Sequence, residues 1–142
     1  MKKENSDDSS KKRYVFDSYA LIALTKHEAD YQLVEKLLEQ AKRNKLEGYI
    51  NIVNLGEVFY IYLKSFNKDL AEKLITAASN LPLTIVDLDI PLLKIAASIK
   101  AQGGISYADS FVIATSLKYD AVVVTGDKEF KKFEKIVKVE WL

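Results

Sequence analysis

The sequence contains no cysteine, and this absence excludes disulfide bonds, thiolate metal sites and cysteine nucleophiles. It contains one histidine, His27, which excludes a ribonuclease mechanism built on two histidines. No apolar run approaches the length of a membrane span, and residues 1–13 lack the apolar core of a signal peptide. These absences predict a soluble cytoplasmic domain without a membrane anchor.

The chain also lacks an excess of charge of either sign. Its 21 lysine and arginine residues balance 20 aspartate and glutamate residues, which gives a net charge of +1. The chain therefore has no general field that attracts nucleic acid, and binding of a polyanion would require a local basic patch or a bound metal ion. With 49% apolar residues in a length of 142, the sequence suits one domain with a substantial core.

The distribution of apolar residues predicts a short tail and one domain. Residues 1–13 (MKKENSDDSSKKR) are polar and mixed in charge, which predicts a disordered tail before a domain over residues 14–142. In the domain, runs of β-branched and aromatic residues predict strands at 14–16, 48–53, 83–86, 121–125 and 137–141. Helical spacing predicts helices that start near residues 20, 30, 54, 69, 89, 106 and 128. This alternation predicts an α/β fold with a parallel sheet.

The stretch from Ser106 to Phe130 is the centre of the predicted site. It begins with Ser106-x-x-Asp109, a helix-starting signature, and continues through an apolar helical run into a buried strand. That strand leads directly into Gly126-Asp127. If the helix and the strand form a right-handed crossover unit, Asp109 and Asp127 face the same side of the sheet.

Four acidic residues share this kind of position at the end of a strand or the start of a helix: Asp17, Glu57, Asp109 and Asp127. Asp17 follows the first strand, and Glu57 ends Asn54-x-x-Glu57, a second pattern of the capping-box type. Taken singly, each acid has an ordinary explanation as a helix cap or a turn residue. Their common placement favours the crevice beyond the carboxyl ends of parallel strands, where open α/β sheets bind ligands.

Four carboxylates in one crevice would repel one another and raise each other's pKa unless a cation lay among them. A site of oxygen ligands, without cysteine or clustered histidine, favours Mg²⁺ or Mn²⁺ over Zn²⁺. Such ions hold phosphate oxygens and activate water, so the pattern favours phosphodiester hydrolysis. Three hydroxyl residues lie near the acids in the sequence, as supporting groups or as ordinary caps: Ser18, Ser106 and Thr125.

Lysines are concentrated after the last of the four acids, at positions 128, 131, 132, 135 and 138. One interpretation is a solvated helix face. The alternative is a patch that contacts phosphates beside the crevice, with Lys128, Lys131 and Lys132 closest in sequence to Asp127.

Four segments together resemble the motifs of PIN-domain nucleases: Val15–Ser18, Asn54-x-x-Glu57, Ser106-x-Ala108-Asp109 and Val124–Phe130. The likeness spans the whole predicted domain and is greatest to the small VapC-type toxins of toxin–antitoxin pairs. It implies a three-layer α/β/α fold around a parallel sheet of strand order 3-2-1-4-5. It also implies an endoribonuclease that depends on Mg²⁺ or Mn²⁺, forms homodimers and, in toxins, is blocked by an antitoxin protein.

The same resemblance assigns the catalytic and metal-binding roles to Asp17, Glu57, Asp109 and Asp127. The hydroxyls of the family motifs fall on Ser18 and Thr125.

Two alternatives stay open. The polar tail is longer than in minimal toxins, which is compatible with a PIN protein of RNA processing that is not a toxin. The segment Asp87-Leu-Asp-Ile-Pro91 loosely resembles the phosphoacceptor loop of receiver domains, which is compatible with a non-enzymatic signalling or binding module.

The helix expected from residue 54 carries more apolar surface than one helix face can bury, contributed by Phe59, Tyr60, Ile61, Tyr62, Leu63 and Phe66. Large exposed apolar patches mark interfaces, so we expect a symmetric homodimer through this helix and its successor over 69–81. The alternative is that Tyr60 and Ile61 pack against that successor within one chain.

Overall fold

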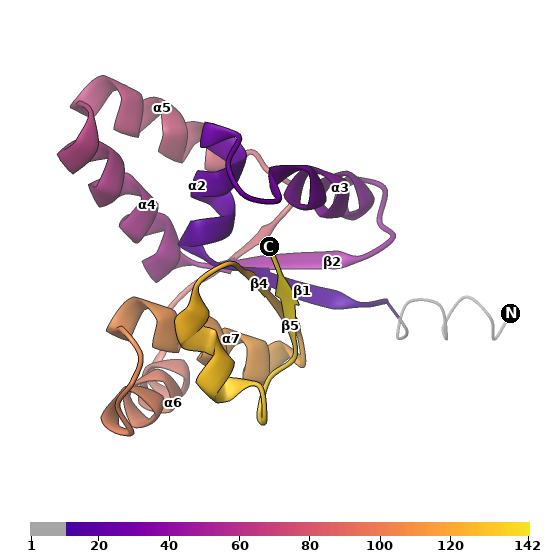
Figure 1. Ribbon diagram of the computed structural model, residues 1–142, viewed down its shortest axis with the longest axis vertical. Coiled ribbons are helices and arrows are strands. Elements are labelled where there is room, and N and C mark those ends of the chain that lie inside the picture. Colours follow the sequence, from indigo (N-terminus) through magenta and orange to yellow (C-terminus); the bar gives the residue numbers. More distant parts are fainter. Residues whose placement is uncertain (1–10) are drawn as a thin grey trace, which may run out of the picture.

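A computed structural model of the chain describes residues 11–142 (Figure 1). In this part of the chain, five strands form one sheet: β1 (Arg13–Phe16), β2 (Glu47–Asn51), β3 (Thr84–Val86), β4 (Val122–Thr125) and β5 (Val139–Trp141). The helices are α2 (Ser18–Lys26), α3 (Tyr31–Lys42), α4 (Ile52–Ser65), α5 (Lys68–Ser79), α6 (Ile90–Ala101), α7 (Tyr107–Tyr119) and the 3₁₀ helix η1 (Lys128–Phe133). The predicted alternation is confirmed. Most of the predicted tail, residues 1–10, lies outside the described residues.

The sheet is parallel throughout and has the strand order β3-β2-β1-β4-β5. On the two sides of β1, Tyr14 pairs with Gly48 of β2 and with Val122 of β4. The order confirms the one that the resemblance implied. In receiver-like sheets the third strand lies beside the first, whereas here β3 forms the outer edge beyond β2. The receiver-like alternative is therefore wrong.

Helices cover both faces of the sheet, which makes three layers (Figure 1). On one face, Val15 and Val123 pack against α6, α7 and η1. On the other face, Phe16 and Val124 pack against α2 and α3, while Ile50 packs against α4 and α5. Because both faces are covered, the central strands are nearly continuous runs of buried apolar residues, and the predicted α/β/α arrangement is confirmed.

Helix α4 starts earlier than predicted, because Asn51 is its cap. The Asn51 side chain accepts a hydrogen bond from the backbone N–H of Val53 at 2.9 Å, which ends β2 and places the helix cap three residues before Asn54, the expected cap. Asn54 instead lies fully buried inside the helix, and its Nδ2 donates to the carbonyl of Ala108 at 3.1 Å. The capping-box explanation of Asn54-x-x-Glu57 is therefore wrong, and Glu57 has no capping role.

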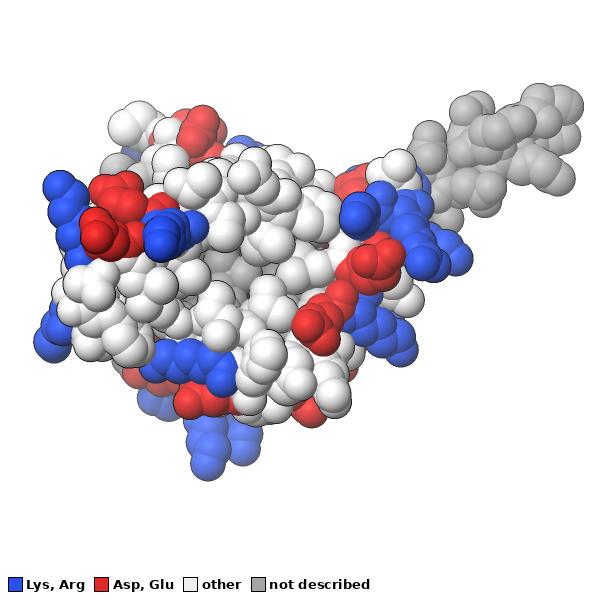
Figure 2. All heavy atoms as spheres, turned by 90° about the horizontal axis from the view of Figure 1, so that it is seen from above, with Lys and Arg blue, Asp and Glu red and all other residues white. Residues whose placement is uncertain are grey.

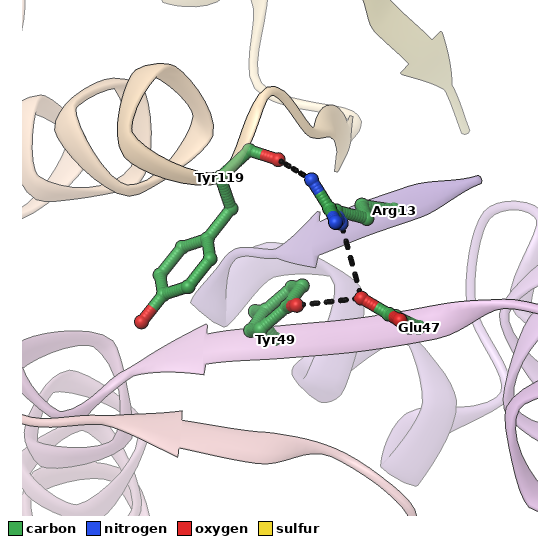
Figure 3. Close-up of polar contacts among 4 residues, drawn as sticks. All are labelled: Arg13, Glu47, Tyr49 and Tyr119. Atoms are coloured by element: carbon green, nitrogen blue, oxygen red, sulfur yellow. Dashed lines mark hydrogen bonds and ion pairs between the residues drawn. The ribbon is translucent and has the colours of Figure 1, made fainter. Parts of the chain in front are cut away.

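A group of polar side chains joins β1, β2 and α7 at the amino end of the sheet (Figure 3). Arg13 Nε donates to Glu47 Oε1 at 3.1 Å, and Arg13 Nη1 donates to the carbonyl of Tyr119 at 3.2 Å. The Tyr49 hydroxyl donates to the same Glu47 oxygen at 2.8 Å, and its ring stacks on Tyr119. The bond from Tyr49 and the nearby Arg13 lower the pKa of Glu47. Arg13, expected at the end of the tail, is thus an ordered part of β1.

The apolar residues of α4 divide between the core and the surface. Tyr62 is buried, and Phe59 and Ile61 pack in the cluster that α4 forms with α5. Tyr60 and Phe66 are about half exposed, at 55% and 52%. The alternative in which Tyr60 and Ile61 both pack inside the chain is therefore correct for Ile61 only.

The side of the molecule seen from above in Figure 2, where α2, α3 and α5 lie, carries a broad surface without charged side chains. Lysine, arginine, aspartate and glutamate side chains border this surface. Among residues 11–142, no helix has the length and apolar character needed to cross a membrane.

Candidate active site

Asp17 lies at the carboxyl end of β1 and caps helix α2. Its Oδ1 accepts a hydrogen bond from the backbone N–H of Ala20 at 2.8 Å, and its Oδ2 accepts one from the hydroxyl of Thr125 at the end of β4. Asp17 is 1% exposed, and Thr125 is fully buried. The adjacent strands β1 and β4 thus fix Asp17 at the point where the strand order reverses.

Asp127 follows β4 and caps η1. Its backbone N–H donates to Thr125 Oγ1 at 2.9 Å, and its Oδ1 accepts from the backbone N–H of Glu129 at 3.0 Å. Gly126 lies between the two bonded residues, against the ring of Tyr19. A Cβ atom at position 126 would lie 2.3 Å from that ring, so any larger residue there would force the Tyr19 side chain to move.

Asp109 lies in the first turn of α7 but does not complete a capping box. The Ser106 hydroxyl accepts from the backbone N–H of Asp109 at 3.2 Å, which is the expected half of the motif. The other half would be a bond from the Ser106 N–H to the carboxylate of Asp109. That N–H instead donates to Glu129 Oε1 at 3.1 Å. The Asp109 carboxyl group is left to share a hydrogen bond with Asp127.

Glu57 extends from the first half of α4 and is half-buried. Its Oε1 accepts a hydrogen bond from the Ser18 hydroxyl at 2.6 Å, which connects α4 to the start of α2. Two buried amides fix α4 against α7: Asn51 Nδ2 donates to Thr115 Oγ1 at 3.0 Å, and Asn54 donates to the first turn of α7. These bonds set the position of Glu57 relative to the start of α7.

Two carboxyl groups of the site, those of Asp17 and Asp109, have raised pKa values, mainly because they are buried. Burial raises the pKa of Asp17 to about 7, with further contributions from the charges of Asp127 and Glu57. The hydrogen bonds that Asp17 accepts oppose this change. Burial also raises the pKa of Asp109 to about 9, followed by its hydrogen bond with Asp127 and the charges of the other acids. These shifts are those of a buried anionic cluster that favours either protons or a cation.

The structure brings the four predicted acids into one neighbourhood and adds a fifth. Oxygen atoms of Asp109, Asp127 and Glu129 lie within 4.8 Å of one another, close enough to share one metal ion. Asp17 and Glu57 are near enough for their charges to act on Asp109. Glu129 lies in the Val124–Phe130 motif but was not among the predicted ligands, although the spacing Asp127-x-Glu129 directly after a buried strand could have indicated it.

The donor set fits a hard divalent cation. Carboxylate oxygens dominate it, and hydroxyls are hydrogen-bonded to the carboxylates of Asp17 and Glu57. Mg²⁺ and Mn²⁺ prefer oxygen ligands of this kind, whereas the sulfur and imidazole ligands typical of structural zinc are missing from this set.

All three lysines predicted beside the site are exposed on η1, and one of them also donates a hydrogen bond within the chain. Lys128 and Lys131 are exposed. Lys132 Nζ donates to the carbonyl of Gly104 at 3.2 Å, in the turn that precedes α7. Lys132 therefore helps to fix this turn against η1.

Replacing Thr125 with valine should destabilise the metal-free protein. Valine keeps the volume of threonine but leaves Asp17 Oδ2 and the N–H of Asp127 without their hydrogen-bond partner. We expect the free energy of unfolding, measured with urea in EDTA, to fall by about 1–3 kcal/mol. Thr84→Val, on the exposed edge strand, is the matched control and should change stability by less than about 0.5 kcal/mol. Equal effects of the two substitutions would contradict the claim that the hydrogen bonds of Thr125 to Asp17 and Asp127 stabilise the fold.

The fold and the site define a parallel α/β domain with a carboxylate cluster at the reversal of strand order. The family model for the PIN domain matches residues 14–136 of the sequence. The chain belongs to the PIN domain family, a family of nucleases. A comparison with curated proteins found no match.

Solved structures with the same fold include several VapBC proteins. VapBC2 from Rickettsia felis, bound to a DNA fragment of its promoter, has a TM-score of 0.70 at 21% identity, over 92% of this chain and 98% of that one. DNA-bound VapBC from Salmonella typhimurium has a TM-score of 0.68 at 16% identity, over 91% and 97%. VapC20 from Mycobacterium tuberculosis, described as a toxin that cleaves the sarcin–ricin loop, has a TM-score of 0.66 at 13% identity, over 85% and 94%. At these identities the likeness shows the fold.

Proposed function

We propose that the chain is a metal-dependent endoribonuclease that hydrolyses phosphodiester bonds in RNA. The observation that carries this proposal is the convergence of Asp17, Glu57, Asp109 and Asp127 at the carboxyl end of the sheet of a PIN domain. The raised pKa values of Asp17 and Asp109 indicate that the protein alone supplies too little positive charge for this cluster. Phosphodiester hydrolysis is the chemistry that a divalent cation among such carboxylates supports.

The acids of the site would hold Mg²⁺ or Mn²⁺, with Glu129 added to the four acids predicted from the sequence. When bound, such an ion neutralises phosphate charge and makes a water molecule more acidic. The hydroxyl of Thr125 orients the carboxyl group of Asp17, and the hydroxyl of Ser18 orients that of Glu57. Ser106 contributes through the backbone, because its N–H positions Glu129.

The RNA substrate would approach along η1. This helix begins directly after Asp127, and Lys128 and Lys131 are exposed on it. Lysines at exposed positions beside a catalytic centre hold backbone phosphates without reading base sequence. Lys132 would contribute less direct binding, because its ammonium group bonds to Gly104.

The proposal is tested by incubating the purified full-length chain with a structured RNA such as total tRNA. Cleavage is expected with Mg²⁺ or Mn²⁺ and none in excess EDTA, with activity restored when the metal is added back. Cleavage that persists in EDTA would contradict the proposal, as would a complete lack of cleavage by a folded protein across a panel of structured RNAs.

A protein antitoxin is the partner that we propose for this nuclease. Solved structures of the same fold include a toxin–antitoxin complex from Klebsiella pneumoniae and VapBC-5 from Mycobacterium tuberculosis, a member of a family of toxin–antitoxin systems. The uncharged surface in Figure 2 offers room for such a partner. If the chain is a toxin, expression of the wild type should arrest growth of the host, whereas Asp17→Asn should not. Normal growth with an active nuclease would favour the alternative role in RNA processing.

Association into a homodimer through α4 and α5 is a further expectation. Tyr60 on α4 and Phe66 directly after it are about half exposed, and aromatic residues often anchor interfaces. Light scattering at micromolar concentration should give about twice the chain mass of 16.1 kDa. Tyr60→Lys combined with Phe66→Lys should give the monomer mass. Ile90→Lys, at the most exposed large apolar residue of α6, is the control and should leave the dimer intact. A monomeric wild type would refute the dimer.

A further inference from the structure

A polar groove of about 550 Å³ lies at the amino ends of β1 and β4. The acidic site follows the carboxyl ends of the same two strands, so the groove and the site are on opposite edges of the sheet. The walls of the groove come from the segment that leads into β1, the end of α7 and the connection from η1 to β5. This groove lies outside the site described above, and no residue of the proposed mechanism lines it.

The lining of the groove is strongly basic. It contains five cationic and two acidic residues, namely Lys11, Lys12, Arg13, Lys135, Lys138, Asp120 and Glu134. Five minus two leaves three positive charges, and because Arg13 is paired with Glu47 outside the lining, an excess of two remains, although the whole chain has a net charge of only +1. A positive excess of this size on one concave surface is what an anionic ligand requires.

Three of the lysines have their charge available for a ligand. Lys12, Lys135 and Lys138 are exposed, and none of them forms an ion pair with another residue in the range 11–142. The guanidinium group of Arg13, by contrast, is already bonded within the chain, to Glu47 and to the carbonyl of Tyr119 at the end of α7 (Figure 3). Helix ends of this kind carry partial negative charge. Arg13 offsets that charge and thereby leaves the lysines to attract an external anion.

The shape and composition of the groove indicate which anion it suits. Its volume exceeds the space of a single phosphate and falls within the usual range of ligand sites. No aromatic side chain lines it, so bases cannot stack there, and lysines act as point charges for phosphates. We infer that the groove binds backbone phosphates of RNA, with no preference for base sequence. This inference rests on the proposed function for the choice of RNA as the ligand.

A path of lysines connects the two edges. Lys128 and Lys131 on η1 begin the path beside Asp127, and the connection that carries Lys135 and Lys138 continues it to the groove. The four residues of β4 separate the two edges by about 13 Å, which corresponds to about four nucleotides of a stacked, helical strand at 3.4 Å each. An RNA that is cut at the acidic site would therefore reach the groove only if its strand extends at least about four nucleotides beyond the cut.

The test measures binding of a fluorescent 20-nucleotide oligouridine to the full-length chain by anisotropy, in EDTA so that neither cleavage nor metal bridging contributes. The groove variant is Lys135→Glu with Lys138→Glu. The control variant is Lys36→Glu with Lys94→Glu, which reverses two exposed lysines on α3 and α6. At 50 mM KCl, we expect the Kd of the groove variant to rise about tenfold or more and that of the control to change less than twofold. Loss of two phosphate contacts should also reduce the slope of log K against log [KCl] by about 1.4.

The outcomes separate this inference from the proposed function. Equal weakening by the two variants would overturn the inference, as would a groove variant that binds like the wild type. Unchanged RNA binding together with lost binding to phosphatidylserine vesicles would also overturn it, in favour of a membrane surface. In one further outcome, the wild type fails to cleave RNA in Mg²⁺, while the groove variant loses RNA binding and the control variant keeps it. The inference about the groove then stands and the nuclease proposal fails.

Discussion

The substitution Asp17→Asn should abolish metal-dependent RNA cleavage while the protein stays folded. Asparagine has the shape of aspartate and can still accept the hydrogen bond from the N–H of Ala20 that caps α2. It lacks the negative charge that would help to hold a cation at this site. Losing a charge that stabilises the transition state typically costs about 3–4 kcal/mol, so we expect the cleavage rate to fall by a factor of about 10²–10³. The measurement is the single-turnover rate on a fixed RNA at saturating Mg²⁺.

The control for this substitution is Asp69→Asn. Asp69 is exposed in the first turn of α5, so its replacement removes one negative charge far from the site and should leave the rate within twofold of wild type. Thermal unfolding in EDTA checks the fold of both variants. The melting temperature of Asp17→Asn should equal or exceed that of the wild type, because a buried carboxyl group with a raised pKa is removed. Wild-type cleavage by a folded Asp17→Asn protein would contradict the assignment.

The metal-free protein should lose stability as the pH rises from 5 to 9. In the folded chain the pKa values of Asp17 and Asp109 are raised from 3.8 to about 7 and about 9. The folded state therefore binds more protons than the unfolded state in this window. Its extra stability is complete below pH 4 and is lost as the pH passes through the two raised pKa values. Because one pKa unit corresponds to about 1.4 kcal/mol, about two units for Asp17 and about four for Asp109 set an upper bound of about 8 kcal/mol on the fall in the free energy of unfolding between pH 5 and pH 9, and we expect a fall of several kcal/mol.

Three comparisons check this pH dependence. Urea unfolding in EDTA at pH 5 and pH 9 gives the fall for the wild type. In the double variant Asp17→Asn with Asp109→Asn, the fall in the free energy of unfolding between pH 5 and pH 9 should be much smaller than in the wild type. Saturating Mg²⁺ or Mn²⁺ should raise the wild-type stability more at pH 9 than at pH 5, because a cation binds the ionised cluster. The pKa of Glu47 is lowered, so this residue is ionised in both states across the window and does not contribute. Equal wild-type stability at the two pH values would refute the coupled acidic cluster.

Much of the fold and of the candidate site was predictable because the relevant signals are local. A short apolar strand precedes Asp17, and a run of β-branched residues precedes Gly126-Asp127; parallel strands place such ends along one edge of a sheet. The start of α7 at Ser106 follows from a side-chain cap that the sequence displays. These local signals located three of the four predicted acids correctly within their elements.

The remaining features depend on contacts between distant segments, which spacing alone does not reveal. Asn51 and Asn54 are both asparagines near the start of α4, and only the packing of α4 against α7 decides that the first caps the helix while the second is buried. Glu129 joins the site because the N–H of Ser106, 23 positions earlier in the chain, donates to it. Arg13 was assigned to the tail because its partners, Glu47 and Tyr119, are far away in the sequence.

The most direct test of the central claim is the position of Mn²⁺ in crystals of the full-length chain, located by anomalous scattering. We expect an anomalous peak for Mn²⁺ among the carboxylates of Asp17, Asp109 and Asp127, at metal–oxygen distances of about 2.0–2.4 Å. The same data collected on Asp17→Asn crystals should show a weaker peak or none. A wild-type crystal soaked in millimolar Mn²⁺ that shows no ion at this position, or an ion bound only elsewhere on the chain, would contradict the account.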